Sequence, residues 1–324
     1  MPAPRDSASQ RGVLVTGASG FIGLALCREL AARGHAVRAA ARHLAAAQLP
    51  AGVESAVLPD LASGFDACAL LDGVETVVHL AAIPQRDADA AEIRRVNVEG
   101  ALRLAEASAG RVRRFVYLSS AITHGAQAGD VPLEENSPLA PRDAYGRAKL
   151  EAERLLAGVA ERSGMELVVL RPPLVYGPGV KGNFLHLLRW IGRGVPLPLA
   201  SVRNRRSLIY VGNLASAIVG CVEHPAAAGQ AFLVADAGAV STPELARAIA
   251  AGLHRPARLF ALPAPLLAAA ALVAGQTENL CRLTESLEVD CSLIRTRLGW
   301  RPPFTFAEGI AASCEWFLRE QAAR

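Results

Sequence analysis

The sequence contains very little lysine. Only two of its 34 basic residues are lysines, Lys149 and Lys181, and the other 32 are arginines. With 30 acidic residues the formal net charge is +4, which is too small to predict a nucleic-acid-binding protein. The densest basic runs, residues 111–114 and 203–206, are short and typical of a solvated loop or a local anion site. Because arginine is the usual basic residue of this chain, a lysine at position 149 needs a chemical explanation.

Cysteine pairs, aromatic residues and long apolar runs are scarce as well. Six scattered cysteines (27, 68, 221, 281, 291 and 314) form no CxxC pair and no zinc-like spacing, which predicts buried thiols in a reducing compartment and no metal site. The composition, 52% hydrophobic, 20% charged and 5% aromatic, is globular. The N-terminus lacks the apolar segment of a signal peptide. Residues 266–274 are too few to span a bilayer and are expected to form a buried helix. We therefore expect a cytoplasmic protein with no membrane partner.

Short β-rich runs alternate with helix-length segments through the first half of the chain. Strands are predicted at residues 13–17, 36–41, 54–61, 76–82, 114–121 and 166–173. Apolar strands separated by helices imply parallel strands joined by crossovers, with both faces of the sheet covered. The predicted fold class is α/β, a Rossmann-like doubly wound parallel sheet.

The pattern changes after about residue 173, where glycine- and proline-rich stretches typical of loops around a binding cleft begin. Residues 207–224 and 230–236 are expected to return to the sheet. Helices near 242–252 and 305–320 are expected to form a smaller C-terminal lobe. The predicted domains are residues 1–173 plus 208–235, and residues 174–207 plus 236–324.

A glycine-rich turn follows the first predicted strand in "VLVTGASGFIG", residues 13–23. Gly17 permits a tight turn, Gly20 lets the backbone approach a pyrophosphate, and Gly23 allows the helix to pack closely on the strand. The helix N-terminus then offers N–H donors to phosphates. The alternative is an ordinary strand–turn–helix, but the context near the N-terminus favours dinucleotide binding.

Several motifs in this order resemble the extended branch of the short-chain dehydrogenase/reductase superfamily, which modifies nucleotide sugars. They are "VLVTGASGFIG", "PDL" (59–61), "HLAA" (79–82), "VNVEG" (96–100), "YLSSA" (117–121), Tyr145-x-x-x-Lys149, "LRPPLVYGPG" (170–179) and "LGW" (298–300). The resemblance covers nearly the whole chain, and it implies a dinucleotide-binding domain followed by a nucleotide-sugar-binding lobe.

Tyr145 and Lys149 stand four residues apart on a helix predicted to begin near Asp143, so both side chains lie on one face. A phenol with a pKa near ~10 is a poor acid–base group at neutral pH. A fixed ammonium beside it lowers that pKa, and a compact lysine can also reach ribose hydroxyls where arginine's planar fork cannot. An exposed tyrosine and a solvated lysine are the alternative. In the family, these residues are the acid–base tyrosine and the lysine that binds the nicotinamide ribose.

The third catalytic group is expected from the end of the strand that contains "YLSSAITHG". The resemblance implies that Ser120 donates a hydrogen bond to the reacting sugar oxygen and that Ser119 lies against the nicotinamide. Either serine could instead cap the strand end. His124 stands where relatives often carry tyrosine, and we expect a structural or loop histidine there rather than a catalytic one.

The cofactor side of the site favours NADP(H) over NAD(H). An NAD-preferring relative usually carries an acid at the end of the second strand, whereas this chain has Ala41 followed by Arg42. A guanidinium suits a ribose phosphate, although Arg42 could also be a surface residue. Asp60 and Leu61 resemble the adenine contacts, and Asn97 supports the central helix. The full expected cofactor set is Gly17, Ser19, Gly20, Phe21, Ile22, Gly23, Arg42, Asp60, Leu61, Leu80, Ala81, Ala82, Asn97, Ser119, Tyr145, Lys149 and Pro172.

The substrate implied by the resemblance is a UDP-sugar. Arg206 matches the family arginine that binds the diphosphate, and Asn183 matches a residue near the uridine. Arg282 is a second diphosphate candidate whose position is offset by two residues. Leu174 replaces an asparagine that many relatives use, which puts one polar substrate contact in doubt.

These residues predict reversible hydride transfer at C4 of a UDP-sugar. A UDP-4-keto-6-deoxy-N-acetylhexosamine reductase in cell-surface polysaccharide synthesis is placed ahead of a UDP-hexose 4-epimerase, because Arg42 suits an exchanged NADP(H) better than a captive NAD. A non-catalytic dinucleotide-sensing protein is the third hypothesis, and the intact Ser120, Tyr145 and Lys149 argue against it. We expect a homodimer without a nucleic-acid partner.

Overall fold

The computed structural model describes residues 12–43, 49–63, 66, 68–84, 88–125, 131–263, 265–266 and 283–322. The chain divides into two compact units. The first unit consists of Met1–Thr123, Pro141–Arg171 and Ala215–Phe232, and the second of His124–Ala140, Pro172–Leu214 and Leu233–Arg324.

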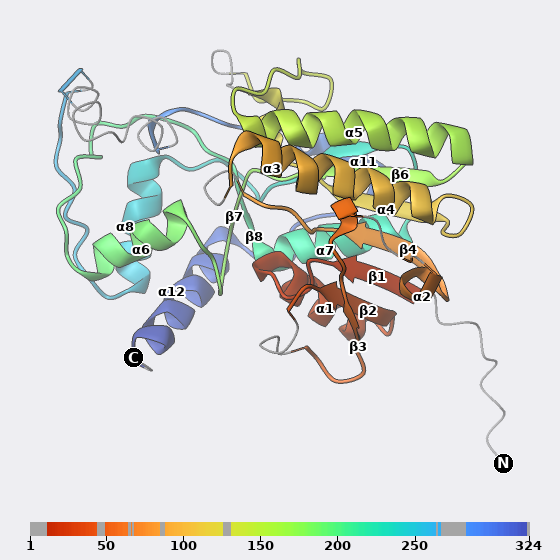
Figure 1. Cartoon of the computed structure of the whole chain (residues 1–324). Helices are drawn as coiled ribbons and strands as arrows, with labels where there is room; N and C mark the ends of the chain where they lie inside the picture. Colours follow the sequence, from red (N-terminus) through yellow and green to blue (C-terminus); the bar gives the residue numbers. More distant parts are fainter. Residues whose placement is uncertain are drawn as a thin grey trace. The chain divides into compact units, whose positions relative to one another are not determined.

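A seven-stranded sheet forms the centre of the first unit, in the order β3-β2-β1-β4-β5-β6-β9 (Figure 1). Its strands are β1 (Gly12–Thr16), β2 (Ala36–Ala41), β3 (Glu54–Val57), β4 (Val74–His79), β5 (Arg114–Leu118), β6 (Glu166–Arg171) and β9 (Ala231–Leu233). The pairings from β3 through β6 are all parallel. The predicted Rossmann-like doubly wound sheet is therefore confirmed, and its order reverses direction at β1, where a ligand crevice is expected.

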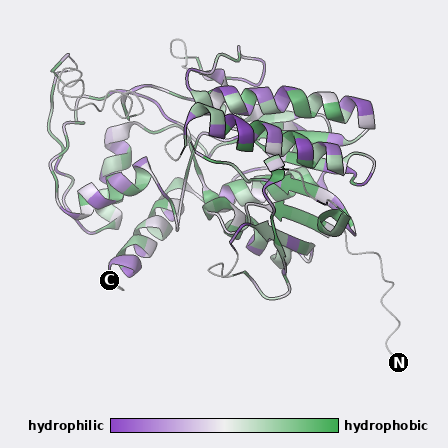
Figure 2. Cartoon of the chain, viewed as in Figure 1, coloured by the Kyte–Doolittle hydropathy of each residue, from purple (hydrophilic) through white to green (hydrophobic). Residues whose placement is uncertain are grey.

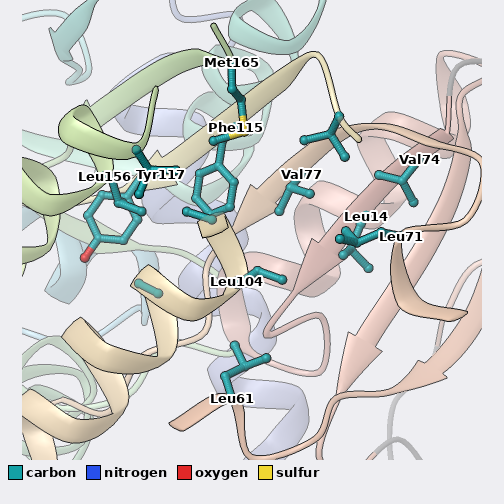
Figure 3. Packing of buried hydrophobic residues seen from close by; sticks show 14 of the residues in the cluster. Leu14, Leu61, Leu71, Val74, Val77, Leu104, Phe115, Tyr117, Leu156 and Met165 are labelled. Carbon is teal, nitrogen blue, oxygen red and sulfur yellow. The ribbon is translucent and has the colours of Figure 1, made fainter. Parts of the chain in front are cut away.

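The central strands β1, β4, β5 and β6 are largely buried and carry runs of apolar residues, whereas the edge strand β3 is mostly exposed. Figure 2 colours most of the sheet as hydrophobic, whereas α5 (Ala144–Ser163) alternates hydrophobic and hydrophilic residues. In Figure 3, Phe115 and Tyr117 of β5 pack in the same buried cluster as Leu104 and Leu156 from the covering helices. The sheet is thus a rigid base for the loops at its carboxyl edge.

The helices of the first unit begin and end at recognisable signals. They are α1 (Phe21–Ala32), α2 (Cys68–Leu71), α3 (Ala90–Arg94), α4 (Gly100–Ser108) and α5, together with most of α7 (Val211–Glu223). The carboxylate of Asp143 accepts a hydrogen bond from the Gly146 amide at 2.7 Å and caps the start of α5. Gly164, with φ of 73°, ends the same helix in the left-handed conformation. Helix α5 starts where the sequence predicts.

A single π-helical turn, Arg95–Glu99, joins α3 to α4. Such turns are uncommon and occur often at functional sites. This one contains Asn97, whose side chain reaches the loop after β4 and is described below.

The second unit has a small parallel sheet of its own, made of β7 (Leu174–Tyr176) and β8 (Leu208–Tyr210). Its helices are α6 (Asn183–Gly192), α8 (Thr242–Gly252), α11 (Ser292–Leu298) and α12 (Phe306–Ala322). The prediction that residues 207–224 return to the main sheet is wrong for their strand, because β8 pairs with β7. β9 does join the main sheet, beside β6.

Asp236 is the polar centre of the second unit. Its carboxylate accepts hydrogen bonds from the Tyr176 hydroxyl at 2.8 Å and the Asn213 amide at 2.7 Å, and from the backbone of Tyr210. Burial raises the pKa of this carboxyl, yet the three donors satisfy its oxygens. This cluster ties the end of the small sheet to the start of α7.

Two expectations about charged and sulfur-containing side chains need correction. Arg114 does not lie in a solvated loop: it is fully buried and donates to Glu166 at 2.7 Å and to the carbonyls of Cys221, Val222 and His224 at the C-terminal end of α7. The free carbonyls at a helix end attract a buried guanidinium. Cys68 is exposed, whereas the other described cysteines are buried.

The helix predicted at residues 266–274 lies almost wholly outside the described residues. Within the described part of the chain, no helix is both long and apolar enough to cross a membrane.

Candidate active site

The glycine-rich turn between β1 and α1 is shaped by close backbone approach. Gly17 has φ of +70°, and a side chain there would lie 2.9 Å from the Ala81 amide nitrogen. The Gly20 amide donates to the Gly17 carbonyl at 2.9 Å, and a Cβ on Gly23 would collide with that same carbonyl oxygen. Only glycine satisfies these contacts, as predicted for a dinucleotide turn.

The N-terminus of α1 opens onto this turn. Gly20 is the N-cap and brings no side chain to the cap, so the first-turn amides of α1 face outward from a bare backbone. Phe21 and Ile22 begin the helix, and Ser19 is exposed in the turn. A bare cap after a strand is a favourable place for a pyrophosphate, because backbone amides and the helix dipole both attract anions. The residues present therefore fit a dinucleotide.

The ends of β2 and β3 carry the groups expected near an adenosine. Ala41 is buried as the last residue of β2, and Arg42 is exposed directly after it. The Asp60 carboxylate accepts from Arg95 at 2.8 Å and from Ser63 at 2.9 Å. Arg95 and Ser63, in that order, hold the pKa of Asp60 below its usual range. Asp60 is thus fixed as a carboxylate.

Asn97 holds the loop that follows β4. Its amide nitrogen donates to the Ile83 carbonyl at 2.9 Å, and its amide oxygen accepts from the Ile83 backbone N–H at 2.7 Å. The preceding residues Leu80, Ala81 and Ala82 are half-buried, and the Leu80 amide donates to the Thr16 carbonyl at 3.3 Å. Asn97, which was predicted to support the central helix, therefore fixes the loop that follows β4. The first residues of this loop were predicted to run beneath the cofactor.

Tyr145 and Lys149 come together on the first turns of α5. Lys149 is 2% exposed, and its ammonium donates to the Leu118 carbonyl at 2.7 Å. The same nitrogen lies 4.7 Å from the ring centre of Tyr117 and 5.7 Å from that of Tyr145. These are cation–π distances. Lys149 is buried beside two phenols, so a solvated surface lysine is excluded.

The pKa values in this cluster are set first by burial. Burial, and then the Asp143 carboxylate, raise the pKa of Tyr145 to about 12. Burial lowers the pKa of Lys149 to about 8, against an upward effect of Glu153. The expected lowering of the Tyr145 pKa is not seen, because burial and the Asp143 carboxylate both raise it. Tyr145 is a protonated phenol at neutral pH in this arrangement.

The two serines after β5 have different surroundings. Ser119 is buried, its amide donates to the Leu170 carbonyl at 2.8 Å, and its hydroxyl donates to the carboxylate of Glu153. Ser120 is half-buried, and its hydroxyl oxygen accepts from the Ile122 amide at 3.4 Å. Of the two, Ser119 is engaged inward by α5 and Ser120 is the more exposed; the role of Ser120 toward a substrate stays a prediction.

A buried ion pair lies behind these serines and was missed at the level of sequence. Glu153 follows Lys149 by one turn of α5, and its two oxygens accept from Arg171 at 3.1 and 2.6 Å. Both side chains are 7% exposed. Tyr145, Lys149 and Glu153 are each four residues apart, so all three lie on one face of the helix. Since a buried carboxylate is nearly always paired, this spacing could have predicted a cation opposite Glu153.

Tyr117, His79 and Thr16 form a second buried group near Lys149. The rings of Tyr117 and His79 are stacked with centres 6.0 Å apart, and His79 shares a hydrogen bond of 2.8 Å with Thr16. Burial, and then Lys149, lower the pKa of His79 to about 3. His79 is therefore a neutral structural histidine behind the site.

Of the predicted substrate residues, Ser120 belongs to the first unit, whereas Asn183 and Arg206 belong to the second. Asn183 is the first residue of α6. Pro172, predicted to contact the cofactor, is buried after β6. Arg206 is half-buried, and its guanidinium donates to the Glu285 carbonyl at 3.0 Å. His124 is buried and shares a hydrogen bond of 3.2 Å with the Ser137 carbonyl, as a loop histidine does.

Two further predictions concern the same lobe. Leu174 is half-buried at the start of β7. Arg282 lies outside the described residues, so its assignment as a second diphosphate contact stays a prediction.

Similarity to known proteins identifies the family. The sequence profile of the NAD dependent epimerase/dehydratase family matches residues 13–235. The chain belongs to this family. A UDP-glucose 4-epimerase of Vibrio cholerae is 36% identical over 323 residues, which cover 97% of this chain and 98% of that protein. The resemblance to extended short-chain dehydrogenases/reductases is thus confirmed, and the chain is an enzyme of that group.

Two other similarities indicate the breadth of the family. A 3 beta-hydroxysteroid dehydrogenase/Delta 5→4-isomerase of Mycobacterium tuberculosis is 31% identical over 347 residues, covering 94% of this chain and 90% of that protein. The solved structure of MoeE5 in complex with UDP-glucuronic acid and NAD is 27% identical, with a TM-score of 0.77 and coverage of 95% of this chain and 99% of that one. The preference for NADP(H) stays a prediction.

Proposed function

We propose that this enzyme is an NAD-dependent 4-epimerase of a UDP-hexose. The observation that carries the proposal is the arrangement of Ser120, Tyr145 and Lys149 at the carboxyl edge of a sheet whose glycine turn fits a dinucleotide. The proposal is supported by the near full-length similarity to a UDP-glucose 4-epimerase and by the NAD in the MoeE5 structure. This reverses the order of the two enzyme hypotheses drawn from the sequence, because neither similarity favours a 4-keto reductase.

The site residues of the first unit each have a defined part in this proposal. NAD, when bound, accepts a hydride from the sugar C4 and returns it. The turn of Gly17, Gly20 and Gly23 holds the diphosphate, and Asn97 keeps the loop after β4 in place. Lys149 hydrogen-bonds the ribose with donors that its bond to Leu118 leaves over.

Proton transfer falls to Tyr145, with Ser120 as its partner. In the oxidative step the phenolate form of Tyr145 would take the proton of the C4 hydroxyl as the hydride leaves, and the phenol so formed would return that proton to the keto oxygen as the hydride comes back. Because burial raises the Tyr145 pKa, the phenolate form would rely on the positive charges of Lys149 and of the bound nicotinamide. The Ser120 hydroxyl donates to the same C4 oxygen and stabilises its developing negative charge. Both groups stand within one unit, on the end of β5 and the first turn of α5.

The UDP portion is assigned to the second unit. Arg206 is proposed to bind the diphosphate, and Asn183, at the N-terminus of α6, the uridine side. A guanidinium carries five N–H donors in a planar fork, which suits phosphate oxygens. Arg282 is kept as a second diphosphate contact. The homodimer predicted from the sequence also belongs to this proposal, and light scattering tests it.

One observation favours the reductase as a second candidate. Arg42 is exposed directly after the last residue of β2, and the position before it is the buried Ala41 rather than a carboxylate. A guanidinium there would favour the 2′-phosphate of NADP(H). A reductase of a UDP-4-keto-6-deoxy-N-acetylhexosamine would exchange that cofactor after each turnover.

The deciding experiment identifies the cofactor and follows the sugar. Purified protein is denatured, and the released nucleotide is identified by mass. The native protein is incubated with UDP-glucose, UDP-galactose, a 3β-hydroxysteroid, and a UDP-4-keto sugar together with NADPH. An epimerase interconverts the two UDP-hexoses without net change in NADH absorbance. Stoichiometric NADPH oxidation with a 4-keto sugar supports the reductase instead, and steroid oxidation alone would overturn both. Bound dinucleotide with no turnover of any of these would favour the sensing protein.

A further inference from the structure

The buried carboxylate of Glu153 connects three elements of the first unit. It belongs to α5, and it accepts hydrogen bonds from Ser119 after β5 and from Arg171 at the end of β6. Glu153 as a whole residue is 6% exposed, so water does not compete for these hydrogen bonds. A buried carboxylate with every oxygen engaged holds its partners in one geometry.

Lys149 makes a parallel connection one helical turn earlier. Its ammonium donates to the carbonyl of Leu118, the residue before Ser119. Two consecutive residues at the end of β5 are therefore fixed to α5 by two charged side chains four residues apart. The next residue along the chain is Ser120. The distance between the end of β5 and Tyr145 depends on both connections.

Glu153 is the acidic residue one helical turn from Lys149 on α5. From β4 the neutral ring of His79 faces the cluster, and from β5 the phenol of Tyr117, whose pKa burial raises. Tyr145 contributes a second neutral phenol, Asp143 caps the helix start, and Arg171 is a cation. Glu153 is the charged group that raises the pKa of Lys149 against the effect of burial.

We propose that Glu153 is the positioning residue of this site: it fixes the carboxyl ends of β5 and β6 against α5, and it places a negative charge one helical turn from Lys149 on the same face of α5. This rests on the proposed function only in taking Ser120, Tyr145 and Lys149 as the reacting groups. Glu153 itself touches neither substrate nor cofactor in this proposal. It acts through Ser119 and Lys149.

The scarcity of lysine makes a direct test possible. Protein labelled with [¹³Cε]lysine should give two side-chain signals, from Lys149 and the exposed Lys181, and Lys149→Arg assigns them. Wild-type Lys149 should titrate near pH 8, and the Lys181 signal provides an internal reference. In Glu153→Gln the Lys149 midpoint should fall by about one pH unit or more, because the amide lacks the charge that stabilises the ammonium.

The matched control is Glu151→Gln, the same substitution two residues away on the exposed side of α5, where Glu151 pairs with Arg94. It should leave the Lys149 midpoint unchanged. An unchanged midpoint in folded Glu153→Gln overturns the proposal. This titration needs no substrate or cofactor, so it stands or falls separately from the proposed function.

Ser119→Ala serves as the second variant, since it keeps the Glu153–Arg171 pair and decides the case if Glu153→Gln does not fold. It removes the bond between β5 and Glu153, so amide exchange in residues 118–122 should accelerate about tenfold while other strands stay protected. Its Lys149 midpoint should stay at the wild-type value. Unaltered exchange in that segment would show that Glu153 does not fix the end of β5.

Discussion

Lys149→Arg gives the sharpest test of the site, because it keeps the charge and changes only the shape. The lysine nitrogen reaches one carbonyl, that of Leu118, at 2.7 Å and lies between two aromatic rings at 4.7 and 5.7 Å. A guanidinium is broader and planar, and the side chain is 2% exposed. The larger group therefore has to displace its neighbours.

The structure allows a magnitude for this change. Overpacking a close-packed interior costs about 1–3 kcal/mol of stability. A lost hydrogen bond from a charged group costs about 1.5–3 kcal/mol, which corresponds to roughly ten- to hundredfold in a rate or an affinity. We expect turnover to fall by about that factor, cofactor binding to weaken and the melting temperature to drop.

The assay is steady-state epimerisation, together with a titration of nicotinamide fluorescence and a thermal melt. Lys181→Arg is the control, since Lys181 is the other lysine of the chain and its side chain is exposed. It should match wild type in all three measurements. Turnover of Lys149→Arg within threefold of wild type, with cofactor binding unchanged, would refute the idea that this position requires lysine.

Three further predictions follow from the same geometry. Tyr145→Phe should lower turnover by about two to four orders of magnitude with cofactor binding nearly intact; turnover within tenfold of wild type contradicts its acid–base role. Arg42→Ala should weaken NADPH binding by about ten- to hundredfold and leave NADH unchanged; equal wild-type affinity for both cofactors makes Arg42 a surface residue. Burial lowers the pKa of His79 to about 3 in the folded chain. Below pH 6.5 this imidazole therefore binds a proton in the unfolded chain but stays neutral in the folded one. The free energy of unfolding should therefore fall by about 3 kcal/mol from pH 6.5 to pH 4. In urea titrations, His79→Gln should flatten that slope, and an equal slope in both proteins sinks the assignment.

The main sheet could be predicted from the sequence because a buried parallel strand is a short apolar run between helices. The observed strands end earlier than predicted in several cases, for example at Val57 rather than residue 61, where the chain turns into the carboxyl-edge loops. The partner of a strand is a tertiary choice that no local pattern records. Residues 208–210 have a strand-like sequence, yet they pair with β7 rather than with the main sheet.

The site could be predicted only at positions where the residue type and its spacing form a recognisable motif. Tyr145, Lys149 and the glycine turn were found because their spacing is a pattern, and the structure brings the first two together. Glu153 and Arg171 were missed because charged residues in single sequences are read as solvent-exposed. Their burial depends on each other, and they lie 18 residues apart in the chain.

The buried cations of the first unit answer why lysine occurs at position 149 in a chain that otherwise uses arginine. Arg114 donates to three helix-end carbonyls and a carboxylate, and Arg171 donates to both oxygens of Glu153. Each donates from two of its guanidinium nitrogens to separate acceptor atoms, which a single ammonium nitrogen does not match. Lys149 has one fixed acceptor, the Leu118 carbonyl, and a pKa that burial lowers to about 8. Arginine holds structure at the other two positions because it cannot lose its proton, whereas position 149 calls for a compact cation with donors to spare for a ribose and a charge that its surroundings can tune.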